Sequence, residues 1–210
     1  MSVATGNKRG RPATASRADV LALVGEQYRA GERVDLTIVA KRLGLGRATI
    51  YRWFGSREAV LGEVIATELE ALIARKRGQV RRRGAAGLLE VFDHINRSLS
   101  RATALRRLLE QEPASAMRLL TSSEGIVQPR AVALVRDLIV AEVSTGSYDP
   151  PADPETLAYA IVRLAEAFLY NDAAIGIRGD YERLRAVEAA LLGVPLKPHR
   201  RSTKSGRARS

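Results

Sequence analysis

Apolar residues recur every three or four positions along most of the chain, which is the spacing of one face of an α-helix. The pattern begins after Ser16, a good N-cap, continues through Val20, Val24 and Tyr28, and stops at Gly31. No segment shows the sustained alternation of apolar and polar residues that a half-buried strand would need. The pattern therefore predicts an all-α fold.

Glycine, proline and capping residues divide this periodic sequence into predicted helices. Their ranges are about 17–30, 36–43, 47–54, 57–80, 85–100, 102–110, 113–121, 128–145, 154–175 and 180–192. The proline-rich segment 149–154 predicts a linker before the last two helices, and Asp153 with Pro154 is a strong start for the first of them.

The stretch 35–61 contains two short helices that meet at a tight turn, Gly44-Leu45-Gly46. Gly44 can adopt the left-handed conformation that such a turn requires. Six residues have the spacing to form a small shared core: Val39, Ala40, Leu43, Leu45, Ile50 and Phe54. This is the geometry of a helix-turn-helix, whose second helix enters the DNA major groove by its N-terminus. The alternative is an ordinary helical hairpin.

The outward residues of the second helix suit contact with DNA. Arg47 can donate to guanine or grip a phosphate, and Ala48 and Thr49 are short enough to permit close approach to base edges. Donors for flanking phosphates follow on the same helix: Tyr51, Arg52 and Trp53. Arg57 opposes the dipole of the next helix, a cost that is explained if a phosphate lies beside that helix N-terminus.

The same stretch resembles the DNA-binding domain of the TetR-type bacterial regulators over residues 16–62. The matching residues are VAKRLGL at 39–45, TIYRWF at 49–54 and SREAVL at 56–61. Gly46 departs from the serine cap usual in that family, and Arg57 replaces its usual lysine. The resemblance implies that Arg47, Ala48 and Thr49 read bases and that Tyr51, Trp53 and Arg57 hold phosphates.

The net charge of +11 lies almost entirely on two tails, which suggests a polyanionic partner. Residues 1–17 carry +4 and residues 197–210 carry +6, with no acidic residue in either segment. In the first tail, Arg9 and Arg11 flank Gly10 as in an AT-hook that enters a narrow minor groove. The alternative is that the tails are solvated and aid solubility only.

The composition argues against an enzyme or a membrane protein. The chain contains no cysteine, and its histidines, His94 and His199, have no metal-site spacing, so we expect no metal, no cofactor and no catalytic residue. No apolar run reaches the roughly 18 residues of a membrane span, and the N-terminus lacks a signal-peptide core. We therefore expect a cytoplasmic protein that does not contact membranes.

Dimers are expected, because one helix-turn-helix reads too few base pairs to select a site in a genome. The last two helices are the best candidates, and in TetR-type proteins the corresponding pair forms a four-helix bundle across a two-fold axis. The candidate contact residues are Leu157, Ile161, Leu164, Phe168, Leu184, Val187 and Leu191. The alternative is that these stripes face the core of a single chain.

The body also resembles the C-terminal domain of QsdR-type regulators of quorum-signal degradation, through RLAEAFLY at 163–170, Asp172 and LLG at 191–193. This resemblance implies a lactone effector. Four polar or charged residues share one helix face: Tyr159, Arg163, Glu166 and Tyr170. They either contain a structural Arg163–Glu166 pair or orient the polar head of a ligand, since charges on an apolar helix need partners. Candidate apolar pocket walls are Phe92, Ile95, Leu99, Met117 and Leu120, for each of which core packing is the default.

Together these features predict a transcriptional regulator that represses from a palindromic double-stranded DNA operator and is released by a small molecule. Activation by the ligand, or architectural DNA binding without sequence selectivity, are the alternatives. The expected division is a flexible basic arm at 1–15, the helix-turn-helix domain at 16–62, a helical ligand-binding and dimerisation domain at 63–196, and a disordered basic tail at 197–210.

Overall fold

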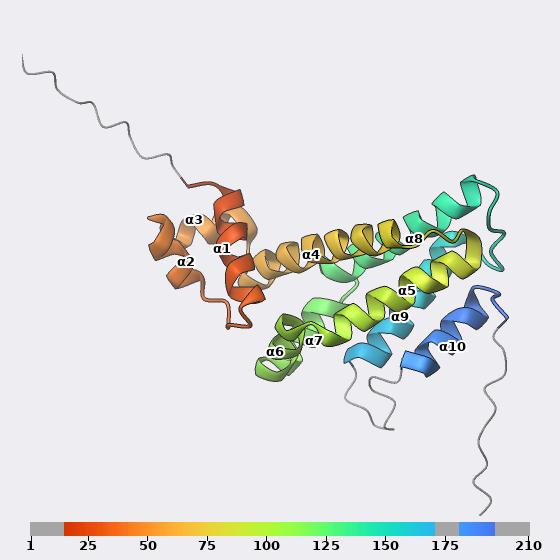
Figure 1. Ribbon diagram of the computed structural model, residues 1–210. Coiled ribbons are helices and arrows are strands. Elements are labelled where there is room, and N and C mark those ends of the chain that lie inside the picture. Colours follow the sequence, from red (N-terminus) through yellow and green to blue (C-terminus); the bar gives the residue numbers. More distant parts are fainter. Residues whose placement is uncertain (1–14, 171–180, 196–210) are drawn as a thin grey trace, which may run out of the picture. The chain divides into compact units, whose positions relative to one another are not determined.

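The computed structural model describes residues 15–170 and 181–195, and within these ranges the secondary structure is entirely helical (Figure 1). The described helices are α1 (Arg17–Arg29), α2 (Leu36–Leu43), α3 (Arg47–Phe54), α4 (Arg57–Gln79), α5 (Gly84–Arg101), α6 (Thr103–Gln111), α7 (Pro113–Thr121), α8 (Val127–Ser144), α9 (Pro154–Tyr170) and α10 (Tyr181–Leu191). The all-α prediction is confirmed. Positions 171–175, expected to continue α9, lie outside the described residues.

Local side chains fix where the first helices begin and end. Ser16 caps α1 by accepting a hydrogen bond from the backbone N–H of Asp19, whose carboxylate in turn accepts from the Ser16 N–H at 2.7 Å. Asp35 caps α2 by accepting from the N–H of Thr37 at 2.7 Å. Gly44 ends α2 with φ of 65°, a conformation in which a Cβ atom would be strained.

The described residues divide into two compact units. The N-terminal unit comprises residues up to Leu69 together with Ala102–Pro129, and the C-terminal unit comprises Glu70–Arg101 and the residues from Arg130 onward. Helices α4 and α8 contribute to both units. The segment that contains α6 and α7 therefore belongs to the unit that carries the helix-turn-helix, whereas the functional boundary expected near residue 62 stays a prediction.

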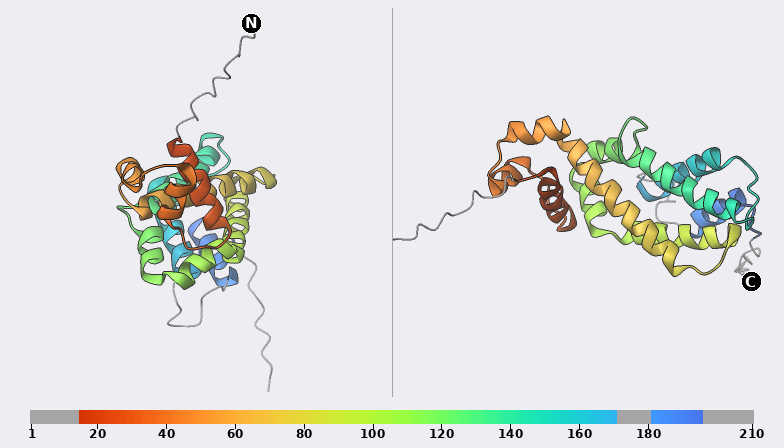
Figure 2. Two further views of the ribbon diagram at one scale, coloured as in Figure 1. Left: turned by 90° about the vertical axis from the view of Figure 1, so that its left-hand side faces the viewer. Right: turned by 90° about the horizontal axis from the view of Figure 1, so that it is seen from above.

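In the N-terminal unit, α1, α2 and α3 pack against one another, and α6 packs on α1 and α7 (Figure 2). The most deeply buried side chains of this unit are apolar: Val20, Val24, Val39, Ile50, Val60 and Leu61. Of the shared core expected for the helix-turn-helix, Val39, Ala40, Ile50 and Phe54 are buried, and Leu43 and Leu45 are half-buried. This core holds α3 in place from one side and leaves its other side exposed.

In the C-terminal unit, α5, α9 and α10 lie side by side (Figures 1 and 2). Their shared core is built from aliphatic side chains: Leu88, Leu89, Leu157, Ala158, Ile161, Leu184 and Ala189. The chain contains few aromatic residues, so small and branched aliphatic residues fill this core instead. Such residues allow helices to pack closely.

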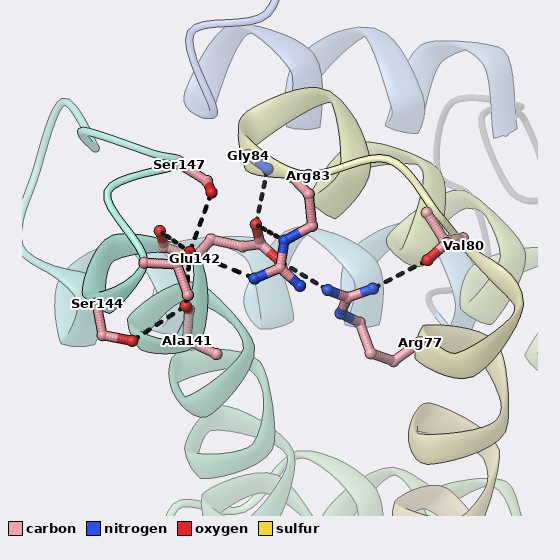
Figure 3. Close-up of polar contacts among 9 residues, drawn as sticks. Arg77, Val80, Arg83, Gly84, Ala141, Glu142, Ser144 and Ser147 are labelled. Carbon is pink, nitrogen blue, oxygen red and sulfur yellow. Dashed lines mark hydrogen bonds and ion pairs between the residues drawn. The ribbon is translucent and has the colours of Figure 1, made fainter.

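A buried carboxylate ties α8 to the connection between α4 and α5 (Figure 3). Glu142, on α8, accepts hydrogen bonds from the Arg77 guanidinium at 2.8 Å and from the backbone N–H of Gly84 at 2.7 Å. The Nε of Arg83 lies 3.3 Å from Glu142 Oε2, the same oxygen that accepts from Gly84. Arg77 also donates to the carbonyl of Val80 at 3.0 Å. Every charge in this cluster therefore has a partner of opposite sign or a backbone dipole, as burial requires.

Candidate DNA-binding surface and effector site

The N-terminal half of α3 is the exposed part of the helix-turn-helix. Gly46 precedes it without any side-chain cap, as expected from the sequence. Arg47 and Ala48 are exposed and Thr49 is half-buried, so this end of the helix presents one long cation and two short side chains. The Thr49 N–H of this first turn donates to the Gly46 carbonyl at 2.9 Å, and no side-chain cap occupies the N–H groups before it. The position of these three side chains is compatible with base contacts, and their role in reading bases stays a prediction.

The C-terminal half of α3 exposes hydrogen-bond donors on one side and packs against the protein on the other. Tyr51 and Arg52 are exposed, and Trp53 is half-buried. The Arg47 guanidinium lies 5.8 Å from the centre of the Tyr51 ring, which places these two predicted contact residues together. Arg17 of α1 stacks on the buried Phe54 ring at 4.1 Å and donates to the carbonyl of Trp53. Arg17 of α1 therefore holds the C-terminal end of α3 in position.

A hollow of about 390 Å³ lies beside α3, at the start of α2. Its lining includes three arginines and two hydroxyl groups: Arg33, Arg47, Arg57, Thr37 and Tyr51. Asp35 also lines the hollow, and its pKa is lowered from the ordinary value chiefly by the hydrogen bond from the Thr37 N–H. The hollow is therefore rich in cations and donors, a combination that suits an anion.

Arg57 is bound within the protein rather than directed to solvent. Its Nε donates to the carbonyl of Val34 at 2.8 Å, and its two terminal nitrogens donate to the Glu112 carboxylate at 3.0 and 2.6 Å. The sequence predicts a phosphate ligand for Arg57; the structure places a carboxylate there. Sequence reasoning missed both Glu112 and Arg33, because Glu112 is 55 residues from Arg57 and Arg33 lies in a loop with no helical periodicity.

The predicted effector residues are distributed over both units. Phe92 and Ile95 are buried in the C-terminal unit and Leu99 is half-buried there, whereas Met117 and Leu120 belong to the N-terminal unit. For these five residues a role in a pocket stays a prediction, and core packing accounts for the buried ones.

On α9, the Arg163–Glu166 ion pair, one of the two alternatives for this helix face, is present. Arg163 donates to Glu166 at 2.9 Å, and its guanidinium lies 5.1 Å from the centre of the Tyr159 ring. Burial raises the pKa of Glu166, and the hydrogen bond from Arg163 opposes that shift. Tyr159 itself is 49% exposed, so it lies beside this pair on the outer side of the helix, and Tyr170 is half-buried.

The predicted dimer residues separate into three groups by their burial. Leu157, Ile161 and Leu184 are buried within a single chain, which favours the alternative that they form its own core. Val187 is 40% exposed. The remaining three are half-buried: Leu164, Phe168 and Leu191. The predicted arm residues Arg9 and Arg11, the C-terminal tail and Asp172 lie outside the described residues.

A second buried carboxylate, also missed by the sequence, lies between α5 and α10. Glu188 is 1% exposed and accepts a hydrogen bond from the Asn96 amide at 2.8 Å, and its Oε2 has no hydrogen-bond partner in the described part of the chain. Burial raises the pKa of Glu188 to about 7, and the charge of Asp93 adds to that effect. The helical period of α10 could have found it, since Glu188 is four residues after the core residue Leu184.

Two other kinds of site are absent from the described residues. No three His, Asp or Glu side chains there are grouped as a metal ion would require. Within the same ranges, no helix combines the length and the apolar character needed to cross a membrane.

Comparison with known proteins identifies the family. Residues 83–193 match the family described as tetracyclin repressor-like, C-terminal domain. The solved structure of QsdR, a TetR-family transcriptional repressor from R. erythropolis, is 30% identical to this chain, with a TM-score of 0.81 over 87% of this chain and 97% of QsdR. The chain therefore belongs to the TetR family of transcriptional regulators, and both resemblances noted in its sequence are confirmed.

A second solved structure supports the fold alone. AlkX, a TetR-family repressor from a Dietzia species implicated in biodegradation of n-alkanes, is 21% identical, with a TM-score of 0.57 over 90% of this chain and 99% of AlkX. No curated protein sequence matches the chain.

Proposed function

We propose that this TetR-family regulator is a sequence-specific repressor that binds a palindromic operator as a homodimer and leaves it when a small molecule binds. The observation that carries the proposal is the exposed N-terminal half of α3, with Arg47 and Ala48 outward, in a chain 30% identical to a known repressor. Because the partner is genomic DNA, we also propose a cytoplasmic location. The basic tails add charge that draws the chain to DNA.

The dimer surface that we propose includes the outer side of α10. Val187 lies there with Ala186 and Ala190, all three exposed, and these small apolar residues leave room for a second helix to approach closely. In a two-fold dimer the same strip meets itself. Leu157, Ile161 and Leu184 support this strip from within the chain rather than touching the partner.

We propose a lactone as the first effector to test, on the basis of the QsdR-type resemblance. The polar face of α9 supplies a guanidinium and a carboxylate, Arg163 and Glu166, that can orient a ligand carbonyl or amide. A ligand that binds one arrangement of the body better than another shifts the population away from the DNA-binding arrangement. A coupling free energy of about 1–3 kcal/mol would weaken operator affinity roughly 5–150-fold.

The first test concerns base reading. A cognate duplex is selected from a random pool with the full-length chain, and affinities for it and for a random duplex are measured by fluorescence anisotropy at fixed salt. Arg47→Ala should weaken cognate binding by roughly 5–150-fold, as expected for loss of one bidentate base contact at about 1–3 kcal/mol, and random binding far less. Arg52→Ala, on the same helix, is the matched control and should weaken both about equally, as a phosphate contact does.

Each other outcome rejects a defined part of the proposal. Equal affinities of the wild-type chain for cognate and random duplexes would establish an architectural DNA-binding protein instead. A uniform loss in Arg47→Ala would make Arg47 a phosphate ligand. Acyl-homoserine lactones and γ-butyrolactones are then added to the complex; release supports the effector proposal, tighter binding indicates an activator, and no change excludes these lactones.

A further inference from the structure

The Glu112 carboxylate binds two arginines of the N-terminal unit. It receives two hydrogen bonds from Arg57, at 2.6 and 3.0 Å, and one from the Nε of Arg33 at 3.2 Å. The side chains of Arg57 and Glu112 are only 18% and 12% exposed, so their attraction is screened less by water than that of a surface pair. Arg33 is largely exposed and closes the cluster from outside.

The arginines bound to Glu112 are also part of the proposed DNA-binding surface. Arg33 and Arg57 line the hollow that contains Arg47 and Tyr51 of α3. A guanidinium fork has the same geometric fit to a carboxylate as to a phosphate. Three of the five N–H donors of Arg57 are directed to Val34 and Glu112, and the carboxylate occupies the fork between its two terminal nitrogens. A phosphate can therefore bind this fork in the same two-bond geometry only by displacing Glu112.

We propose that Glu112 occupies the place of a DNA phosphate at Arg33 and Arg57 and thereby lowers the affinity of this regulator for DNA. This inference rests on the proposed DNA-binding function. The neighbouring acids do not take this place: Glu58 lies 3.7 Å from Arg57 but is about half exposed, and Asp35 caps α2.

The position of Glu112 allows helix movements to regulate its competition with a DNA phosphate for Arg33 and Arg57. Glu112 is the single residue between α6 and α7, so a small movement of either helix changes its distance to both arginines. Withdrawal of the carboxylate would offer two more cations to DNA, and its insertion would remove them.

The test is a salt titration of DNA binding by the full-length dimer. Glu112→Gln keeps the shape of the side chain and removes its charge. Glu110→Gln is the matched control, because Glu110 is an exposed acid on α6 that forms a long ion pair with Arg106, at 3.9 Å. Affinity for a random 20-base-pair duplex and for the selected cognate duplex is measured between low and moderate salt.

We expect Glu112→Gln to bind both duplexes about 3- to 10-fold more tightly at low salt. The slope of log affinity against log salt should become steeper by roughly 1 for each half-site, since one phosphate contact on B-DNA contributes about 0.9. Glu110→Gln should change affinity less than 2-fold. Adding Arg57→Gln to the Glu112→Gln chain should abolish the gain, whereas Arg57→Gln in the wild-type background should have a smaller effect.

Glu112→Asp provides a second variant that retains the charge. Its shorter side chain should weaken the contact with Arg57 and give a gain of about 2-fold with no change in net charge. Circular dichroism melting verifies that each variant is folded. An unchanged or weaker affinity in both folded Glu112 variants would overturn the inference and show that the pair only positions α4, whereas failure of the wild-type chain to bind any duplex would instead reject the proposed function.

Discussion

Glu188 is a carboxylate whose buried environment disfavours its charged form. Its carboxylate lies between α5 and α10 with one partner, Asn96, and burial raises its pKa to about 7 from an ordinary 4.5. Between pH 4.5 and about 7, Glu188 therefore keeps its proton in the folded state but has lost it in the unfolded state. The stability that this proton confers is present below pH 4.5 and is lost as the pH rises through about 7.

Glu188→Gln should remove this pH dependence. The glutamine keeps an oxygen that can accept from Asn96 but carries no charge, so the variant should be more stable than the wild type at pH 8 by roughly 3 kcal/mol and closer to it at pH 5. Urea unfolding at both pH values, with equal protein concentrations, measures the difference. A difference that is the same at pH 5 and pH 8 would show that Glu188 is uncharged at both or solvated.

Single residues on α3 were predictable from sequence, whereas their long-range partners were not. Arg47, Ala48 and Tyr51 follow from the helical period, which determines the side of a short helix that faces outward. The partner of Arg57 does not, because its carboxylate comes from a segment that only the folded chain brings near. A cation at a helix N-terminus predicts an anion beside it, but not whether that anion belongs to DNA or to the protein.

The elements themselves were largely determined by local signals. Ser16, Asp35 and Gly44 begin or end helices through contacts within three or four residues, so the sequence predicts these ends closely. The grouping of α6 and α7 with the helix-turn-helix depends instead on packing of α6 against α1, for which no local pattern exists. The predicted effector residues are distributed over both units for the same reason.

Glu142 should be required for the stability of the connection between α4 and α5. It is almost fully buried, accepts hydrogen bonds from Arg77 and the Gly84 N–H, and forms an ion pair with Arg83, so truncation leaves the Gly84 N–H and Arg77 without their acceptor (Figure 3). We expect Glu142→Ala to lower the free energy of unfolding by about 3–5 kcal/mol. Glu142→Gln should cost less, roughly 2 kcal/mol, because its amide oxygen can still accept from the Gly84 N–H.

Denaturant unfolding measures both Glu142 variants against Glu155→Gln. Glu155 is exposed on α9 and lies 3.4 Å from Arg136, so loss of its charge should change stability by at most about 0.5 kcal/mol. Equal small effects at the two positions would mean that the Glu142 cluster is solvated in solution.

At the scale of the whole molecule, the operator recognition that we propose depends on a second copy of the chain. The sequence assigns the apolar stripes of α9 and α10 to the dimer, but part of these stripes packs inside a single chain. Leu157, Ile161 and Leu184 are almost fully buried there. An apolar stripe in the sequence does not show whether it packs within one chain or against a second copy, since both require the same helical spacing. The residues left for a partner are those that a single chain leaves exposed.

Val187→Glu should therefore convert the dimer into monomers with little effect on the folded chain. Val187 is 40% exposed in one chain, and a carboxylate there would be buried without a partner when two copies meet. Sedimentation velocity at micromolar concentration should give a monomer, and affinity for the palindromic operator should fall while affinity for a half-site remains. Val140→Glu, on α8 and similarly exposed at 44%, is the control and should leave the dimer intact. If Val140→Glu dissociates the dimer and Val187→Glu does not, the two-fold contact runs along α8, and the outer strip of α10 faces solvent.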